Sequence, residues 1–529
     1  MPKKFTLRIL QSNKCRAYST FLSRTKSNRN LLESNKKLYD TILTFQRPRR
    51  NARKVRKFLV RTDFYARFYA LLMSPTTIIL LNRTNVFYDN EKLLSIKVKE
   101  KYMKRTLTVD VADRIGEKVK ICGRVSNIRI FKEVEFYIIR DRTGEIQAVF
   151  ESQNAFKKNV KKNAIVEAYG EIISENRAPG GFELIVERID ISSEPLISQP
   201  ISTESWSKTN IDLELDNRAI SLRNPANIDI FELQSAIAKY FRDFFSNQDF
   251  VEVFTPKIVS KGVESGSKTF KLNYFGHQVE LAQSPQLYKQ ILVGTQLERV
   301  FEIGHAYRAE LHDTPRHLNE FISMDVEMSY IDCLDDLLKL EESFLHQLFS
   351  EININFKDML NRRKIEQLPE IKNIPRVAYE ELKKMYKKIR KHEVSIKDSN
   401  LEKFACDYFM ETEKLPLVFI THFPLVQRPF YTKPSDDGVC SESFDLIYSG
   451  LEITSGSMRI HQYDLLKESL RKYKIDEEGI KSYLQAFEGG MPKHGGFAIG
   501  LERLTSQILN LNNVKLASLF PRDRKRYVP

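Results

Sequence analysis

Two alternating runs in residues 299–328, joined by a polar loop, constrain the fold more than any other feature. Alternation with a period of two predicts a pair of half-buried β-strands. The second run has an apolar face, formed by Ile322, Met324, Val326 and Met328. Its opposite face carries a ring, a hydroxyl and two carboxylates, on Phe321, Ser323, Asp325 and Glu327. We expect the apolar face to pack on a core, which leaves the polar face to a ligand.

The first run presents two small residues, Gly304 and Ala306, on the face that ends at Arg308. We therefore expect a flat ligand to lie against that part of the sheet. The connecting loop adds ionisable groups, on Glu310, His312, Asp313, Arg316 and His317. Ionisable groups clustered beside small residues favour a ligand site over an ordinary hairpin with a solvated face.

A chain of 529 residues is expected to hold more than one domain. Its basic excess lies at one end. Residues 1–102 contain 24 of the 84 Lys+Arg and 6 of the 69 Asp+Glu, a net charge of +18. The remaining residues contain 60 Lys+Arg and 63 Asp+Glu, a net charge of −3. Residues 1–32 contain no acid, which is typical of an organelle transit peptide. Three interpretations of residues 1–102 stay open: a targeting segment, a basic arm that binds RNA phosphates, or translated sequence upstream of a start at Met73 or Met103.

The five cysteines are dispersed, with no C-x-x-C spacing: Cys15, Cys122, Cys333, Cys406 and Cys440. This pattern argues against a disulfide framework or a structural zinc site. It fits a reducing compartment, so we expect a cytoplasmic protein, with organelle import through residues 1–32 as the alternative. The longest apolar run, residues 70–81, is too short to span a membrane.

Residues 103–195 contain five β-rich runs, at 119–125, 134–141, 145–150, 164–173 and 182–191. Five short strands in about 80 residues suit a small barrel of the OB type, a fold that often binds single-stranded nucleic acid. Gln147 lies on the opposite side of its strand from Ile146 and Ala148, so it is expected to face a ligand. Phe136 suits either the core or the binding face.

Residues 196–225 form a polar connector, which we interpret as a hinge, and residues 226–529 form a second domain. It begins with an amphipathic helix at 228–247 whose aromatic stripe suits a core or a subunit interface. Residues 353–415 are rich in Lys and Glu and are interpreted as an inserted subdomain without obvious chemistry.

The loop at residues 261–267 is rich in Gly and Ser and holds one acid, Glu264. It lacks the spacing of a P-loop or a Rossmann fingerprint. A helix is predicted to begin near Pro285, with Gln286 and Lys289 on one face. Such a pair could hold a carboxylate, although alone it is more often solvated surface.

A hairpin is predicted at residues 444–459, with Ser449 and Gly450 as its two-residue loop. In that register Ile447 lies opposite Glu452 and Asp445 lies opposite Thr454, so Asp445 and Glu452 share a face. Two neighbouring carboxylates repel unless a cation lies between them, so we expect Mg²⁺ there.

A glycine-rich approach at residues 489–500 leads into a short strand and a helix. Arg503 lies in the first turn of that helix, where the helix dipole disfavours a cation. This local conflict indicates that Arg503 has a role elsewhere.

These segments together resemble the class II aminoacyl-tRNA synthetases, and in particular the aspartate–tRNA ligases of the archaeal and eukaryotic type. The resemblance runs from Met103 to Pro529 and is carried by the segments at 306–310, 500–503 and 519–526 and by the helix and strand that end at Pro256. It implies an α+β fold, in which an N-terminal OB-type anticodon-binding barrel joins a catalytic antiparallel sheet flanked by helices. It also implies a homodimer. It does not cover residues 1–102.

The resemblance implies a two-step ligase reaction. The α-carboxylate of L-aspartate attacks the α-phosphate of ATP, and the terminal ribose of tRNA then accepts the aspartyl group. Arg308 and Arg503 match the catalytic arginines. The ATP-binding positions are Arg308, Glu310, His317, Phe321, Glu452, Gly500 and Arg503, with Phe321 and Arg503 on opposite faces of the adenine.

The other family positions follow in the same way. The Mg²⁺ ligands match Asp445, Glu452 and Ser455. The positions that bind aspartate match Glu264, Gln286, Lys289, Asp325 and Arg459. In these, Lys289 and Arg459 hold the side-chain carboxylate, Gln286 and Asp325 hold the amino end, and Glu264 belongs to a loop that closes over the substrate. Phe136 and Gln147 match residues that stack on and read the anticodon.

The alternatives are an asparagine–tRNA ligase, a lysine ligase and a catalytically retired RNA-binding paralogue. Two cations directed at one side chain argue against asparagine, because a neutral amide would leave buried charge unpaired. Arg459 would repel lysine. Ser457 and Met458 depart from the usual residues of the family and resemble the asparagine enzymes slightly. Whether tRNA(Asn) is also charged stays open, since Ser126 matches neither residue common at that position.

Overall fold

A computed structural model describes residues 103–131, 134–151, 159–204, 209–260, 268–391 and 399–528. The chain divides into two compact units at Leu196 and Ile197. Glu264 and residues 1–102, Cys15 among them, lie outside the described residues.

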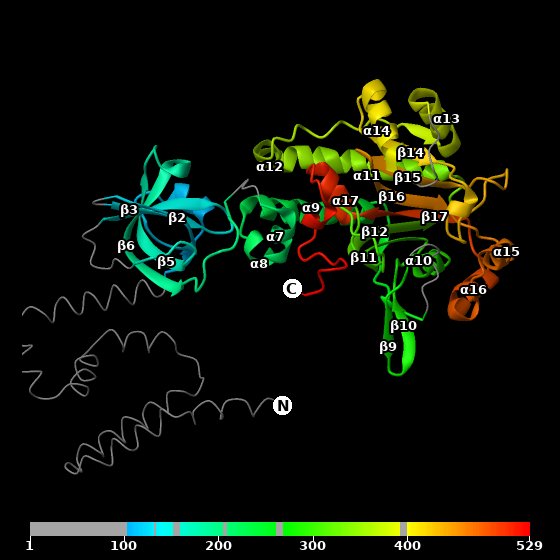
Figure 1. The fold of residues 1–529 in the computed structure, drawn as a ribbon, viewed down its shortest axis with the longest axis horizontal. Coiled ribbons are helices and arrows are strands. Elements are labelled where there is room, and N and C mark those ends of the chain that lie inside the picture. Colours follow the sequence, from blue (N-terminus) through cyan, green and yellow to red (C-terminus); the bar gives the residue numbers. More distant parts are fainter. Residues whose placement is uncertain are drawn as a thin grey trace, which may run out of the picture. The chain divides into compact units, whose positions relative to one another are not determined.

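The first unit is a β-barrel, which confirms all five predicted strands (Figure 1). Its sheet runs β1-β2-β3-β4-β6-β5 and is closed by pairing of β2 with β5. The elements are β1 (Arg105–Thr106), η1 (Thr108–Arg114), β2 (Lys118–Ile130), β3 (Val134–Arg140), β4 (Glu145–Glu151), β5 (Ile165–Ser174), η2 (Pro179–Gly181) and β6 (Phe182–Ser193). Tyr137, Ile139, Ile146, Ala148 and Phe150 point into its core. The alternate residues of β3 and β4 therefore face outward.

The second unit is built on an eight-stranded sheet of order β13-β14-β15-β16-β17-β12-β11-β7. Its strands are β7 (Val251–Glu252), β11 (Arg299–Tyr307), β12 (Glu320–Ser329), β13 (Arg376–Ala378), β14 (Leu417–Thr421), β15 (Ser443–Tyr448), β16 (Leu451–Met458) and β17 (His494–Gly500). The two edge strands pair in parallel and the six central strands are antiparallel. The antiparallel sheet flanked by helices that we predicted is confirmed.

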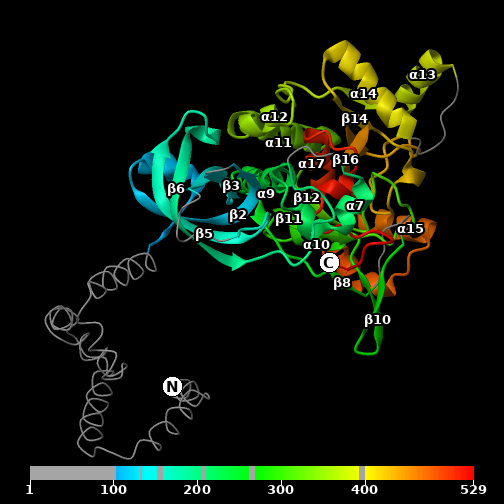
Figure 2. The ribbon, with the colours of Figure 1, turned by 60° about the vertical axis from the view of Figure 1, so that its left-hand side comes forward.

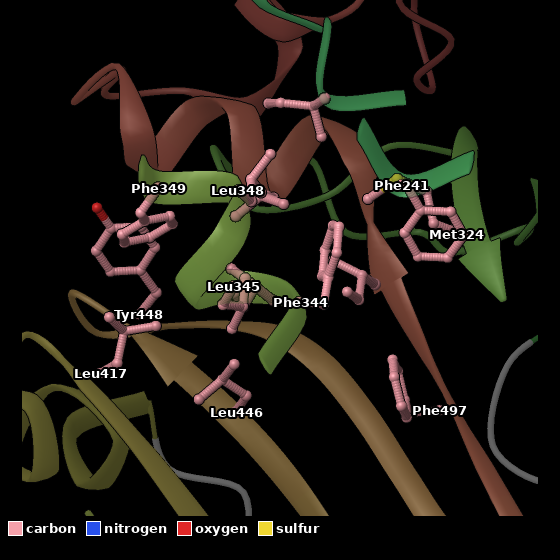
Figure 3. Close-up of a cluster of buried hydrophobic side chains, with 14 of the residues drawn as sticks. Phe241, Met324, Phe344, Leu345, Leu348, Phe349, Leu417, Leu446, Tyr448 and Phe497 are labelled. Carbon is pink, nitrogen blue, oxygen red and sulfur yellow. The ribbon is translucent and has the colours of Figure 1, made fainter. Parts of the chain in front are cut away.

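One face of this sheet is covered by α9 (Pro225–Ser246), α11 (Leu334–Asn355) and α17 (Leu501–Ile508) (Figures 1 and 2). The core between them is aromatic-rich, and Phe241, Phe344 and Phe497 from three different elements converge in it (Figure 3). The predicted apolar face of β12 lies here, with Met324 and Val326 fully buried. The polar face of β12 is thereby directed to the other side of the sheet.

The remaining helices are α7 (Ile211–Asp216), α8 (Arg218–Ser221), α10 (Gln286–Val293), α12 (Lys357–Arg362), α13 (Tyr379–Arg390), α14 (Ser399–Glu413), α15 (Tyr463–Tyr473) and α16 (Lys481–Glu488). The short helices η3 (Leu425–Gln427), η4 (Glu478–Ile480) and η5 (Val514–Ala517) complete them. A separate small sheet joins β8 (Ile258–Val259), β10 (His277–Leu281) and β9 (Lys271–Tyr274). Its β9–β10 hairpin extends away from the main sheet (Figures 1 and 2).

Two regions differ from the simplest expectation. The predicted connector 196–225 contains the helices α7 and α8. Within the predicted insert 353–415, β13 adds the edge strand to the main sheet by pairing with β14. In the part of the chain that the structure describes, no helix combines the length and the hydropathy that a membrane span requires. The four described cysteines are free thiols.

Candidate active site

Two adjoining cavities, of about 440 and 110 Å³, lie on the open face of the main sheet. Five residues line both cavities: Arg308, Glu310, Glu452, Ser455 and Ala498. The expectation that Gly304 and Ala306 form the floor is wrong. A side chain at Gly304 would meet Glu302 and Lys257 within about 3 Å, so that space is already filled. Small residues of β12, β16 and β17 line the cavities instead: Ser323, Gly456, Ala498 and Gly500.

The inner end of the larger cavity is a buried cluster of two cations and two carboxylates. The Lys289 ammonium lies 3.0 Å from Asp325 Oδ1 and 3.3 Å from Glu327 Oε2. The Arg459 guanidinium binds Glu327 through two hydrogen bonds, of 2.9 and 3.1 Å. All four side chains are at most 5% exposed. Such a cluster is retained in a core only where its charges are matched.

From the sequence, we expect asparagine to leave the charges of Lys289 and Arg459 unpaired. The structure corrects this expectation, because each of the two cations has an acidic partner within the chain. Charge count at these two residues alone therefore does not exclude an amide substrate. Glu327 is the residue whose role the sequence did not reveal. Burial opposes its charge, but Arg459 and Lys289 outweigh burial and lower the pKa of Glu327 to about 2. The sequence signal for Glu327 was its position two residues after Asp325, on the same face of β12.

Gln286 begins α10 and lies beside this cluster, as the predicted helix face requires. Its Oε1 accepts a hydrogen bond of 3.3 Å from Arg459. Its Nε2 is buried and has no hydrogen-bond partner among the described residues. A buried amide donor without a partner costs free energy unless a ligand satisfies it. Gln286 thus adds a free donor to the inner end of the cavity.

The outer, smaller cavity brings together the residues predicted for nucleotide binding: Arg308, Glu310, His317, Phe321, Glu452, Gly500 and Arg503. The Arg308 guanidinium carbon lies 5.4 Å from the centre of the Phe321 ring. Glu310 Oε2 lies 3.8 Å from His317 Nε2. Burial and the nearby Arg503 lower the pKa of His317, so its ring is neutral at pH 7. Glu310 and His317 both come from the loop between β11 and β12.

The structure explains why a cation is tolerated at Arg503, in the first turn of α17. Its Nη1 donates to the Glu452 carbonyl oxygen at 2.8 Å and to Glu452 Oε1 at 3.2 Å. The side chain thus crosses from α17 to β16 instead of facing the positive end of its own helix. Glu502, the residue before it, accepts hydrogen bonds of 3.1 and 3.0 Å from the Ile322 amide.

The predicted carboxylate pair lies on the β15–β16 hairpin, but its register is not regular. Ile447 pairs with Glu452 as expected, whereas Asp445 pairs with Ser455 and not with Thr454. The difference is a one-residue bulge, which a pattern of alternation does not reveal. Because of it, Asp445, Glu452 and Ser455 all line the larger cavity. Burial and the charge of Glu452 raise the pKa of Asp445, despite the nearby Arg428.

Arg428 is a second residue that the sequence did not single out. Its guanidinium contacts both oxygens of Asp445 at 2.9 Å and donates to Ser455 Oγ at 3.2 Å. It therefore lies at the place where the sequence predicts a cation. The predicted insert also contributes, since Tyr379, Leu401 and Glu402 line the same cavity.

On the barrel, Phe136 and Gln147 lie on the same side of the sheet, away from the barrel core, although Gln147 is buried there by its neighbours. Phe136 is partly exposed, and its ring meets Phe131 edge-on with centres 5.8 Å apart. Gln147 lies opposite Ile138, two residues along β3 from Phe136, and donates a hydrogen bond of 3.0 Å to Glu183. Of the two positions left open for Phe136, the structure shows the outward one.

Comparisons with known proteins agree with both units. Residues 210–524 match the family of class II tRNA synthetases (D, K and N), and residues 119–191 match the OB-fold nucleic acid binding domain. The aspartate–tRNA(Asp/Asn) ligase of Thermus thermophilus is 39% identical over 428 residues, which cover 80% of this chain and 100% of the relative. The aspartate–tRNA(Asp) ligase of Pyrococcus abyssi is 37% identical over 424 residues, which cover 78% and 97%.

Solved structures show the same relationship. The aspartyl-tRNA synthetase of Entamoeba histolytica has a TM-score of 0.72 at 27% identity, covering 81% of this chain and 93% of that one. The asparaginyl-tRNA synthetase of Pyrococcus horikoshii, complexed with asparaginyl-adenylate, has a TM-score of 0.74 at 27% identity, covering 80% and 100%. From the matched domains and the extent of these relatives, the chain belongs to the aspartate–tRNA ligase family of class II tRNA synthetases and is a ligase.

Proposed function

We propose that this enzyme attaches L-aspartate to tRNA(Asp) in an ATP-dependent reaction with an aspartyl-adenylate intermediate. The observation that carries the proposal is the position of Arg308. Its side chain lines both cavities, its Nε is buried without a hydrogen-bond partner among the described residues, and no described carboxylate pairs with it. An unpaired cation between an amino-acid pocket and a nucleotide pocket suits the point where a carboxylate attacks a phosphate.

The inner cluster suits the amino acid. Lys289 and Arg459 hold the side-chain carboxylate, while Asp325 and Gln286 orient the amino end. Asp325 and Glu327 match the charges of Lys289 and Arg459 within the cluster. The preference for aspartate over neutral asparagine is therefore proposed to rest on the geometry of these groups as well as on charge, and pyrophosphate exchange with each amino acid decides it. Glu264 is proposed to act from the loop at 261–267.

The outer cavity suits ATP. Arg308 neutralises the α-phosphate as the aspartate carboxylate approaches it, so two anions are held in line. Phe321 stacks on one face of the adenine and Arg503 covers the other. Glu310 accepts from the adenine amino group, His317 binds the phosphates, and Gly500 leaves room beside the ring. No protein nucleophile or general base is needed.

Mg²⁺ fits the donor set of Asp445, Glu452 and Ser455. The set offers two carboxylates and one hydroxyl, and the described residues include no group of three or more acids, histidines or cysteines placed to hold a metal by themselves. That count suits Mg²⁺, which commonly takes one or two carboxylates and completes its shell with water and substrate phosphates. When bound, the ion would neutralise phosphate charge. Arg428 contacts Asp445 and Ser455, so its side chain must move aside, or shift to the phosphates, when Mg²⁺ binds.

For the nucleic acid, we propose that Phe136 stacks on an anticodon base and that Gln147 reads a base edge. The relatives from Thermus thermophilus and Pyrococcus abyssi are named for different tRNA ranges, Asp/Asn and Asp. We propose that the barrel of this chain contributes to whether tRNA(Asn) is also a substrate. A homodimer through α9 and β7 and a cytoplasmic location are part of the proposal.

Pyrophosphate exchange tests the first step. Purified enzyme with ATP and Mg²⁺ should exchange pyrophosphate with aspartate and not with asparagine. Dominant exchange with asparagine would favour the sister ligase, and no exchange with either would favour the RNA-binding paralogue. Charging of tRNA(Asp) and tRNA(Asn) transcripts, side by side, then decides the tRNA range.

A further inference from the structure

The C-terminal segment, residues 513–526, lies directly against the loop 309–319 that carries Glu310 and His317. The two segments exchange backbone hydrogen bonds. Val514 N donates to Pro315 O at 2.9 Å, and Asn319 N donates to Arg522 O at 2.9 Å. Arg524 Nη1 also donates to Leu311 O at 3.2 Å. Contacts at three points along the loop fix its path, and one of the contacting residues, Val514, also lines the smaller cavity.

Lys515 is the charged centre of this contact. Its ammonium lies 2.5 Å from Asp313 Oδ1 in the loop and 2.7 Å from Asp523 Oδ2 in the segment. The Lys515 side chain is 6% exposed and that of Asp523 is 3% exposed. Burial opposes its charge, yet hydrogen bonds to both carboxylates raise the pKa of Lys515. The hydrogen bond from Lys515 lowers the pKa of Asp313, so the pair stays ionised at neutral pH.

The same segment is anchored on its other side to the helices that begin the second unit. Arg526 bonds to Asp212 and Asp216 of α7, at 2.7 and 2.8 Å, and to Asp523 at 3.0 Å. Buried Arg218 of α8 donates to three carbonyl oxygens of the segment, those of Leu516, Ser518 and Leu519. The segment is therefore a fixed support, and Lys515 transmits that support to the loop.

We propose that residues 513–526 position the nucleotide-binding loop and that Lys515 is the positioning residue which sets the loop geometry through Asp313. The inference rests on the proposed nucleotide role of this loop. Lys515 lines neither of the two cavities, so it acts through Glu310 and His317 and not by contact with ATP. The aspartate cluster lies on α10, β12 and the end of β16, away from this contact.

The test compares Lys515→Met with Asp313→Asn in the full chain. Binding of a non-hydrolysable ATP analogue is measured by calorimetry, and the KM values for ATP and aspartate are measured by pyrophosphate exchange. Lys515→Met should weaken analogue binding and raise the KM for ATP by about 10- to 100-fold, as expected when a loop shifts by roughly 1 Å, with the KM for aspartate unchanged. Lys515→Arg should restore part of the loss.

Asp313→Asn removes the charge at the loop end of the contact, and with it the 3.4 Å ion pair of Asp313 with Lys525, while Lys515 stays paired with Asp523; it tests the charged link between segment and loop if Lys515→Met folds poorly. Lys493→Met is the matched control, because Lys493 forms an exposed ion pair with Asp332 elsewhere in the same unit. The inference is overturned if Asp313→Asn binds the analogue as well as wild type does, or if both KM values rise together. If wild type binds the analogue but shows no aspartate-dependent exchange, the proposed function fails while the positioning role stands.

Discussion

At the scale of single residues, the inner end of the cavity is defined by charges that the chain itself matches. Arg459 holds Glu327 through two parallel hydrogen bonds while its remaining donors reach Ser457, Gln286 and the Gly496 carbonyl oxygen. A guanidinium held at this many points has little freedom to adapt, although Nη1 has only one acceptor, Ser457, for its two N–H groups. Substrate selection at this end therefore depends on geometry as much as on charge.

Arg459→Ala should abolish aspartate activation and leave ATP binding nearly intact. The variant removes the predicted carboxylate clamp and leaves Glu327 with Lys289 as its cation. Loss of one partner of a buried ion pair is expected to lower the free energy of unfolding by about 3–5 kcal/mol. Aspartate-dependent pyrophosphate exchange measures the loss, and calorimetry with an ATP analogue measures retention at the other cavity. Arg459→Lys keeps the charge without the paired hydrogen bonds and is the control. Retained activation in Arg459→Ala would remove the clamp from the proposal.

We expect the titration of Glu502 to lower the free energy of unfolding as the pH rises. Burial and the neighbouring Glu320 raise the pKa of Glu502 to about 7, above its ordinary value of 4.5. Between these values the folded chain holds a proton that the unfolded chain releases, so folding becomes less favourable by up to about 3 kcal/mol as pH increases. Glu502→Gln keeps an acceptor for the Ile322 amide and should flatten this slope. Thermal unfolding at pH 5 and pH 8 measures the difference; equal slopes in both proteins would contradict it.

At the scale of elements, the bulge in β16 decides which side chains share the cavity. Thr454 is turned away from it, and its hydroxyl donates a hydrogen bond of 2.6 Å to Glu341 of α11. Glu341 is fully buried among apolar side chains, and burial raises its pKa to about 8, so it is largely protonated at neutral pH. A polar pair inside an apolar layer is costly, and we propose that it is retained because it helps to hold the bulge in place.

Thr454→Val should therefore disturb the metal and phosphate side of the site selectively. The substitution keeps the shape of the side chain, removes the hydroxyl and leaves Glu341 without this partner. A loss of roughly 1.4 kcal/mol would raise the KM for ATP and the Mg²⁺ requirement about tenfold, with little effect on the KM for aspartate. Exchange assays at graded Mg²⁺ measure both constants. Thr454→Ser retains the hydroxyl and should behave as wild type; an unchanged Mg²⁺ requirement in Thr454→Val would argue against the link.

Sequence patterns predicted the five barrel strands, the strands β11, β12 and β15–β17 of the main sheet and the two faces of β12, because burial on one face imposes alternation directly; they did not predict β13 or β14. They did not predict the bulge, since one extra residue leaves the apolar pattern of a buried strand almost unchanged. The filled space at Gly304 was equally hidden, because Lys257 and Glu302 reach it from positions set by tertiary packing. Arg428 and the residues of the insert lie far along the chain from the motifs, so only the folded sheet shows that they line the cavity.

At the scale of the whole molecule, chemistry and tRNA recognition are assigned to separate units. All the proposed aspartate, ATP and metal positions belong to the second unit, whereas Phe136 and Gln147 belong to the barrel. Adenylate formation needs no nucleic acid, so changes on the barrel face should affect only the transfer step.

Phe136→Ala tests this separation. Stacking of a base on an aromatic ring contributes about 1–3 kcal/mol, so the KM for tRNA in the charging assay should rise roughly tenfold. Pyrophosphate exchange should remain at the wild-type level, because the Phe136 ring lies outside the barrel core and its removal leaves that core intact. Val109→Ala, which shortens an exposed apolar side chain of η1 in the same barrel, is the control. If Phe136→Ala charges tRNA(Asp) with an unchanged KM, the outward face of β3 and β4 is not where the anticodon binds; if it lowers exchange as well, the two units do not act separately.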